Sequence, residues 1–76
     1  MEENNLLTKL NKEYNIKIEN GVAYFIEDNY IIAHNQKELV EFYIESFEYK
    51  YHQTFEGEIQ TREYYSNIIN ELTKLI

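Results

Sequence analysis

Apolar residues in the first part of the chain recur at helical spacing. They are Leu6, Leu7, Leu10 and Tyr14. With Asn4 or Asn5 as the N-cap, this spacing predicts a short helix over about residues 4–13.

The period then changes to the alternation of a half-buried strand, in which Ile16 and Ile18 alternate with polar neighbours. Asn20-Gly21 follows, and this dipeptide is a strong hairpin signal because both positions tolerate positive φ. Residues 22–26 predict a second strand, apolar on both faces. A turn at Glu27-Asp28-Asn29 leads to a third strand over residues 30–33. The three strands form an antiparallel meander.

Helical spacing returns after Asn35, which precedes Glu38 at the distance of a capping box, with Asn in place of the usual Ser or Thr. The apolar positions behind it are Leu39, Val40, Tyr43, Ile44, Phe47 and Tyr51. They predict an amphipathic helix near residues 36–51. Gly57 marks a break, and a final helix runs from Thr61 to the C-terminus. The fold class is α+β: a helix, a three-stranded antiparallel meander and two helices packed on the sheet.

Composition limits both the size and the class of the protein. A chain of 76 residues supports one core, so residues 1–76 are expected to form a single domain. Eight Tyr and four Phe are too many for a disordered acidic tail. There is no cysteine, no apolar stretch long enough for a membrane span, and no signal peptide at the acidic N-terminus. We expect a cytoplasmic protein.

Charge is the most informative feature. The chain has 14 Asp and Glu residues and only 7 Lys and Arg residues, which gives a formal net charge of −7. Phosphate attracts Lys and Arg, so direct binding to nucleic acid is not expected. The expected partners are proteins with basic surfaces. The alternative explanation of the negative charge is that it serves only to keep the protein soluble. Acids stand at separated points: Glu27 and Asp28 at the second turn, and Glu56 and Glu58 around Gly57. Such carboxylates resemble a run of phosphates.

One face of the predicted long helix carries a further stripe of acids. Its members are Glu38, Glu41, Glu45 and Glu48. Like charges at this spacing destabilise a helix by roughly 0.2–0.5 kcal/mol per pair. A solvated outer face and a partner-binding face both remain open explanations.

Residues that could support catalysis are few. His34 and His52 belong to no metal-binding pattern, and no cysteine is present to complete a zinc site. His52 and Glu56 are four residues apart but straddle the predicted end of the helix. No GxSxG motif occurs, and two glycines cannot form a phosphate-binding loop. We therefore predict no enzymatic activity, no cofactor and no metal.

The tyrosines divide into two groups by position. Tyr43, Tyr51 and Tyr65 fall on apolar stripes and are predicted to be core residues. The other group lies at element ends or off the stripes: Tyr14, Tyr30, Tyr49 and Tyr64. Tyr beside an acid, as in Glu13-Tyr14 and Glu63-Tyr64, can stack on a base or an arginine while the carboxylate pairs with it. Stacking within the fold is the alternative.

Three segments carry a resemblance to a known family. They are Asn5-Leu6-Leu7 through Glu13-Tyr14-Asn15-Ile16-Lys17-Ile18, then Leu39-Val40-Glu41 with Tyr43-Ile44-Glu45-Ser46-Phe47, then Phe55-Glu56-Gly57-Glu58 with Glu63-Tyr64-Tyr65. With the element order, these segments resemble a small acidic phage-encoded type II-A anti-CRISPR family. The family's hairpin tip carries Asp-Gly where this chain has Asp28-Asn29, its strand region is longer and its helix connection is more acidic.

The resemblance implies a non-enzymatic DNA mimic that binds a guide-RNA-loaded Cas nuclease as a monomer, 1:1, and blocks target DNA. The short flanking motif is read by a few Arg contacts, so a small inhibitor is sufficient. By this likeness the partner-binding residues are Glu13, Tyr14, Glu27, Asp28, Glu56, Glu58 and Tyr64. Another Cas effector or another nucleic-acid enzyme stays open as the target.

Two other functions fit the same sequence. An immunity or antitoxin-type protein that neutralises a basic nuclease toxin would use similar acids on a similar body. A self-associating domain would instead pair the apolar strand 22–26 across an exposed sheet edge.

Overall fold

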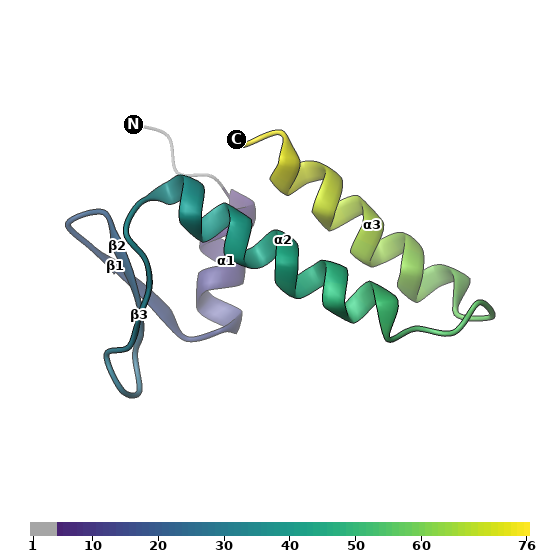
Figure 1. Cartoon of the computed structure of the whole chain (residues 1–76), viewed down its shortest axis with the longest axis horizontal. Helices are drawn as coiled ribbons and strands as arrows, with labels where there is room; N and C mark the ends of the chain where they lie inside the picture. Colours follow the sequence, from purple (N-terminus) through teal and green to yellow (C-terminus); the bar gives the residue numbers. More distant parts are fainter. Residues whose placement is uncertain (1–4) are drawn as a thin grey trace. The chain divides into compact units, whose positions relative to one another are not determined.

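The computed structural model describes residues 5–76 (Figure 1). The elements are α1 (Asn5–Glu13), β1 (Ile16–Glu19), β2 (Val22–Phe25), β3 (Ile31–Ala33), α2 (Gln36–His52) and α3 (Ile59–Thr73). This order and the antiparallel sheet confirm the predicted α+β class. The chain falls into two compact units, Met1–Leu39 and Val40–Ile76. That residues 1–76 form a single domain stays a prediction.

The sheet of the first unit has the order β1-β2-β3, and both neighbouring pairs are antiparallel. Ile16 pairs with Phe25, and Ala23 pairs with Ala33, so these four residues lie on one face. Ile16 and both alanines are buried, and α1, which contacts β1, buries Leu7 and Leu10. The core of this unit therefore lies between α1 and one face of the sheet. The Asn20-Gly21 hairpin is confirmed, because both residues have positive φ, 52° and 81°.

The start of α2 is fixed by a side-chain cap. The Asn35 Oδ1 accepts a hydrogen bond from the Glu38 N–H at 2.9 Å, and the Asn35 carbonyl accepts one from the Leu39 N–H. The Glu38 carboxylate reaches back to the N–H of His34 at 2.8 Å, one residue before the position expected in a capping box. This hydrogen bond, helped by the His34 imidazole at 3.2 Å, lowers the pKa of Glu38.

The lowered pKa of Glu38 predicts a pH-dependent contribution to folding. A carboxylate whose pKa is lower in the folded state stabilises that state above its ordinary value of 4.5, and the contribution is lost as pH falls through the lowered value. We expect Glu38→Gln to reduce the urea unfolding midpoint at pH 7 and to reduce it less at pH 3. Glu41→Gln on the same helix is the control. An equal effect of Glu38→Gln at both pH values would contradict this assignment.

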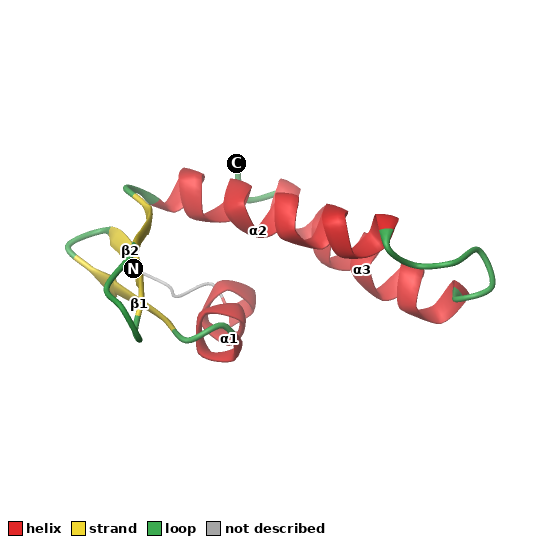
Figure 2. Ribbon diagram, turned by 60° about the horizontal axis from the view of Figure 1, so that its bottom comes forward, coloured by secondary structure: helices red, strands yellow, loops and turns green. Residues whose placement is uncertain are grey.

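The second unit is a pair of helices, the rest of α2 and the whole of α3, joined by residues 53–58 (Figure 2). Tyr43 and Phe47 of α2 are buried, as are Ile68 and Leu72 of α3. The rings of Phe47 and Tyr65 lie 6.0 Å apart between centroids and connect the two helices. The core of this unit is therefore an aromatic and aliphatic seam between two helices.

Arg62 adds a second link between these helices. Its guanidinium lies over the ring of Tyr51, 4.6 Å from the centroid. Of the tyrosines predicted to be core residues, Tyr43 is fully buried, whereas Tyr51 and Tyr65 are half-buried. The two helices are thus joined by partly exposed aromatic contacts as well as by the buried seam.

Some predicted boundaries were wrong. α3 begins at Ile59 rather than Thr61, because the Arg62 N–H already donates to the Glu58 carbonyl. It ends at Thr73 rather than at the C-terminus, since the Ile76 N–H bonds the Thr73 carbonyl, a tighter turn than that of an α-helix.

The second strand also ends one residue earlier than predicted. Ile26 lies outside β2 and is 53% exposed. The Asn29 N–H donates to the Phe25 carbonyl, so the chain turns directly after Phe25. At the N-terminus of the chain, Asn5 begins α1 and Asn4, the other proposed cap, lies outside the described residues. Among the helices of residues 5–76, none has both the length and the apolar character needed to cross a lipid bilayer.

Candidate partner-binding surface

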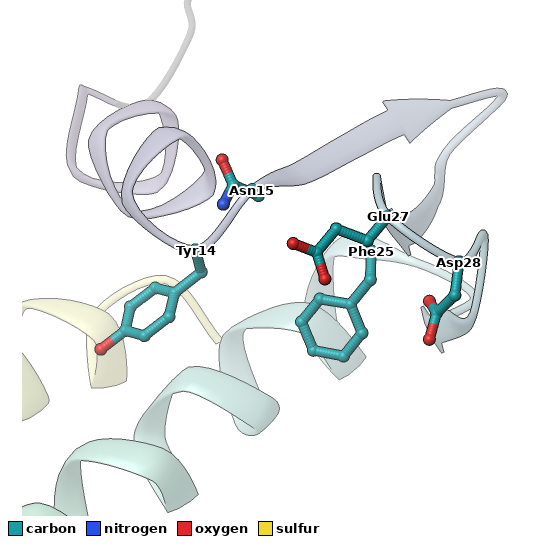
Figure 3. A pocket seen from close by; sticks show the side chains of 5 residues that line it. All are labelled: Tyr14, Asn15, Phe25, Glu27 and Asp28. Carbon is teal, nitrogen blue, oxygen red and sulfur yellow. The ribbon is translucent and has the colours of Figure 1, made fainter.

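Three of the predicted partner-binding residues line one pocket in the first unit. Tyr14, Glu27 and Asp28 surround a cavity of about 300 Å³ together with Asn15 and Phe25 (Figure 3). These five residues are called the Tyr14 pocket below. They come from the end of α1, the end of β2 and the turn before β3, so folding brings together acids and aromatic rings that are distant in the sequence. Glu13, the neighbour of Tyr14, is exposed.

A reversal of the backbone after α1 places Tyr14 at this pocket. The Tyr14 N–H still donates to the Leu10 carbonyl at 2.9 Å, as in a helix, but Asn15 has a positive φ of 55°. Asn tolerates this left-handed conformation better than most residues. The Asn15 carbonyl then accepts the Ile26 N–H at 2.9 Å, which fastens the end of α1 to the end of β2. One wall of the pocket is therefore held by backbone hydrogen bonds.

The turn between β2 and β3 forms the other wall. The Phe25 N–H donates to the Tyr30 carbonyl, and the Asn29 N–H donates to the Phe25 carbonyl. Asn29 has a φ of 57°, and the Asp28 Oδ1 accepts the Tyr30 N–H at 3.0 Å. The rings of Phe25 and Tyr30 stack at 6.4 Å between centroids. This turn thus holds Glu27 and Asp28 beside the Phe25 ring.

The negative charge of the pocket is not neutralised by a cation of the described chain. Among the described residues, ion pairs involve Glu19, Glu38 and Glu71, and none involves a carboxylate of the pocket. No Lys or Arg lines the cavity. Glu27 makes no hydrogen bond within residues 5–76, and Asp28 uses one carboxylate oxygen in its own turn. The pocket therefore presents negative charge beside two aromatic rings to the surroundings.

A second group of predicted residues lies in the second unit, at the connection between its helices. Residues 53–59 are called the α2–α3 tip below. Glu56 and Glu58 are both exposed there, and neither takes part in an ion pair within the described chain. Phe55 is 76% exposed and Ile59 70%. Large apolar side chains exposed beside carboxylates are typical of protein interaction surfaces.

The remaining predicted residue, Tyr64, lies on α3. It is 51% exposed and its ring lies 5.6 Å from that of Tyr65. Tyr30 and Tyr49, which the sequence also places at element ends or off the apolar stripes, are exposed as well. Tyr14 is half-buried, because it lines the pocket.

The stripe of acids on α2 is exposed along its whole length, with Glu41, Glu45 and Glu48 all facing solvent. Glu38 has a structural role in the cap of the helix. Exposure of this face is compatible with both explanations, a solvated outer face and a partner-binding face.

Each histidine lies beside an acid of the α2 stripe. His34 pairs with Glu38, and His52 lines a shallow hollow of about 220 Å³ together with Glu48, Tyr51, Ser66 and Ile69. Within residues 5–76, no three His, Asp or Glu side chains are arranged to hold a metal ion. The absence of enzymatic activity, of a cofactor and of a metal stays a prediction.

Two residues of the Tyr14 pocket were missed from the sequence, Asn15 and Phe25. Asn15 carries a weak local signal, since Asn between a helix and a strand favours a left-handed reversal. Phe25 carries none, because a strand residue next to a turn is equally compatible with the core. A comparison of the chain with protein-family models, curated proteins and solved structures finds no match.

Proposed function

We propose that this chain is a non-enzymatic, DNA-mimicking inhibitor that occupies the basic nucleic-acid groove of a nuclease. The observation that carries the proposal is the set of exposed acids at the Tyr14 pocket and the α2–α3 tip, none of which is neutralised by a cation of the described chain. Lys and Arg of a groove built for phosphates would supply that neutralisation. The binding residues proposed are Glu13, Tyr14, Glu27, Asp28, Glu56, Glu58 and Tyr64.

Aromatic rings beside these acids, half-buried at Tyr14 and Phe25 and exposed at Phe55, support an interaction with protein rather than solubility alone. Acids that serve only solubility need no aromatic neighbours, whereas Tyr and Phe provide most of the contact energy in protein interfaces. Tyr14 and Phe25 accompany Glu27, and Phe55 accompanies Glu56. Each acid group therefore combines charge, which steers the encounter, with apolar area, which stabilises the complex.

The resemblance to the type II-A anti-CRISPR family names the first target to test, a guide-RNA-loaded type II Cas nuclease. The inhibitor would bind 1:1 as a monomer and exclude the duplex next to the motif that the nuclease reads. Because the contact depends on charge, its affinity should fall steeply as salt rises.

A target-DNA gel-shift assay tests this function. The chain is titrated into the guide-loaded nuclease before labelled DNA is added, and we expect the shift to disappear near one inhibitor per nuclease. Adding the chain after the DNA should have a much smaller effect, because the groove is then occupied. An unchanged shift with intact cleavage would remove this nuclease as the target. Other Cas effectors and neighbouring toxin nucleases would be tested next.

A further inference from the structure

The Tyr14 pocket has the chemistry of a site for one particular side chain. Its volume of about 300 Å³ lies at the lower end of the range for ligand pockets, roughly 300–1,000 Å³. Two aromatic rings and two carboxylates line it, and no cation does. We infer that this pocket takes the guanidinium group of a single arginine presented by the partner. The inference rests on the proposed function in assigning the arginine to a basic protein surface.

The carboxylates provide the charge that a cation requires. Glu27 has no hydrogen-bond or ion-pair partner in the described chain, and Figure 3 shows its carboxylate directed toward the side of the pocket formed by Tyr14 and Asn15. Asp28 keeps one oxygen for the Tyr30 N–H, which leaves the other able to accept a second hydrogen bond. A guanidinium in the cavity could therefore donate hydrogen bonds to both residues.

The rings select arginine over lysine. A guanidinium is planar, stacks on aromatic faces and donates up to five hydrogen bonds in a fixed fork. Tyr14 and Phe25 line the cavity while they keep their contacts within the fold, so a guanidinium inside the cavity would lie against both side chains. A lysine ammonium is compact and strongly hydrated, so it would use the carboxylates and gain less from the rings.

The pocket is held in its shape before any partner arrives. The Ile26–Asn15 hydrogen bond fastens one wall, and the Asn29–Phe25 hydrogen bond closes the turn of the other. The stacked rings of Phe25 and Tyr30 restrict the Phe25 side chain further. A preorganised site loses less conformational freedom on binding, which favours recognition of a single side chain.

Peptide titration of the intact chain tests the inference without any nuclease. The probes are acetyl-Gly-Arg-Gly-amide, its Lys counterpart and its citrulline counterpart, which keeps the shape of arginine without the charge. NMR spectra should show saturable shifts at Tyr14, Phe25 and Glu27 with the arginine peptide. We expect the Lys and citrulline peptides to bind about tenfold more weakly or worse, a difference that one lost charge-assisted or stacking contact produces.

Two substitutions in the pocket and one outside it make the test specific. Glu27→Gln removes a charge from an exposed side chain and should weaken the arginine peptide about tenfold. Tyr14→Leu removes a ring and should reduce the preference for Arg over Lys. Glu45→Gln, on an exposed face of α2 in the second unit, has the same chemistry as Glu27→Gln and should leave peptide binding unchanged. Dispersed NMR spectra confirm that each variant is folded.

The outcomes separate this inference from the proposed function. If the arginine peptide gives no saturable shift, or if Lys binds as well as Arg, the pocket is no guanidinium site, even if the chain inhibits the nuclease. If the arginine peptide binds while the gel shift is unaffected, the pocket stands and the Cas nuclease is the wrong target. Equal effects of Glu27→Gln and Glu45→Gln would show general attraction to the acidic surface and would overturn the inference.

Discussion

The double replacement Glu56→Lys and Glu58→Lys is expected to abolish inhibition of the nuclease while leaving the fold intact. Both side chains are exposed at the α2–α3 tip and without an ion-pair partner in the described chain. Reversal of their charge would place like charges against a basic groove, which costs several kcal/mol. We expect the inhibitory concentration to rise by at least about 100-fold, as each 1.4 kcal/mol corresponds to a factor of ten.

The fold should tolerate this change. Glu58 precedes α3, but its side chain makes no capping hydrogen bond. The cost is the loss of a favourable interaction with the N-terminus of the helix, about 0.3–1 kcal/mol for each charge. Circular dichroism and thermal unfolding of the variant would measure it.

Replacing Glu41 and Glu45 by Lys gives the matched control. It changes the net charge by the same amount on an exposed face of α2. If the two double variants lose inhibition equally, net charge rather than the tip determines binding. Full inhibition by folded Glu56→Lys/Glu58→Lys protein would exclude the tip from the interface.

The second large effect is expected for stability. Tyr43→Ala should leave the chain largely unfolded, because Tyr43 is the largest of the fully buried side chains. Truncation of a buried large aromatic residue to Ala costs about 3–5 kcal/mol. A domain of this size without disulfide or metal is stable by only about 3–5 kcal/mol in total. Circular dichroism and urea titration of the variant would show the loss of the cooperative transition.

Tyr49→Ala is the control for this substitution. Tyr49 lies on the same helix, so helix propensity changes equally, but its side chain is 68% exposed. Its unfolding free energy should stay within about 0.5 kcal/mol of the unmodified chain, as for most surface substitutions. A Tyr43→Ala variant with the same midpoint as Tyr49→Ala would show that the buried seam of the second unit does not limit stability.

Local patterns were sufficient for most of the secondary structure. The Asn20-Gly21 hairpin and the Asn35 cap were predicted because each depends on residues within four positions of one another. Boundaries failed at the ends of elements, where turn hydrogen bonds begin. Ile26 continues the apolar run of β2, yet the strand ends at Phe25, whose carbonyl accepts the Asn29 N–H as the chain turns toward β3. The periodicity of a strand does not reveal where such a turn begins.

For the candidate site, the sequence determined the kinds of group and the tertiary structure decided which of them meet. Acids beside tyrosines could be listed from the chain, and the exposure of Tyr49 and Tyr64 followed from their positions off the apolar stripes. The meeting of Tyr14 with Glu27 and Phe25 could not be predicted. It depends on the left-handed reversal at Asn15 and on the hydrogen bond from the Ile26 N–H to the Asn15 carbonyl, which joins segments distant in the sequence. The amino-acid composition therefore determined the net charge of this protein. Backbone hydrogen bonds between distant segments determined which acids lie around the pocket.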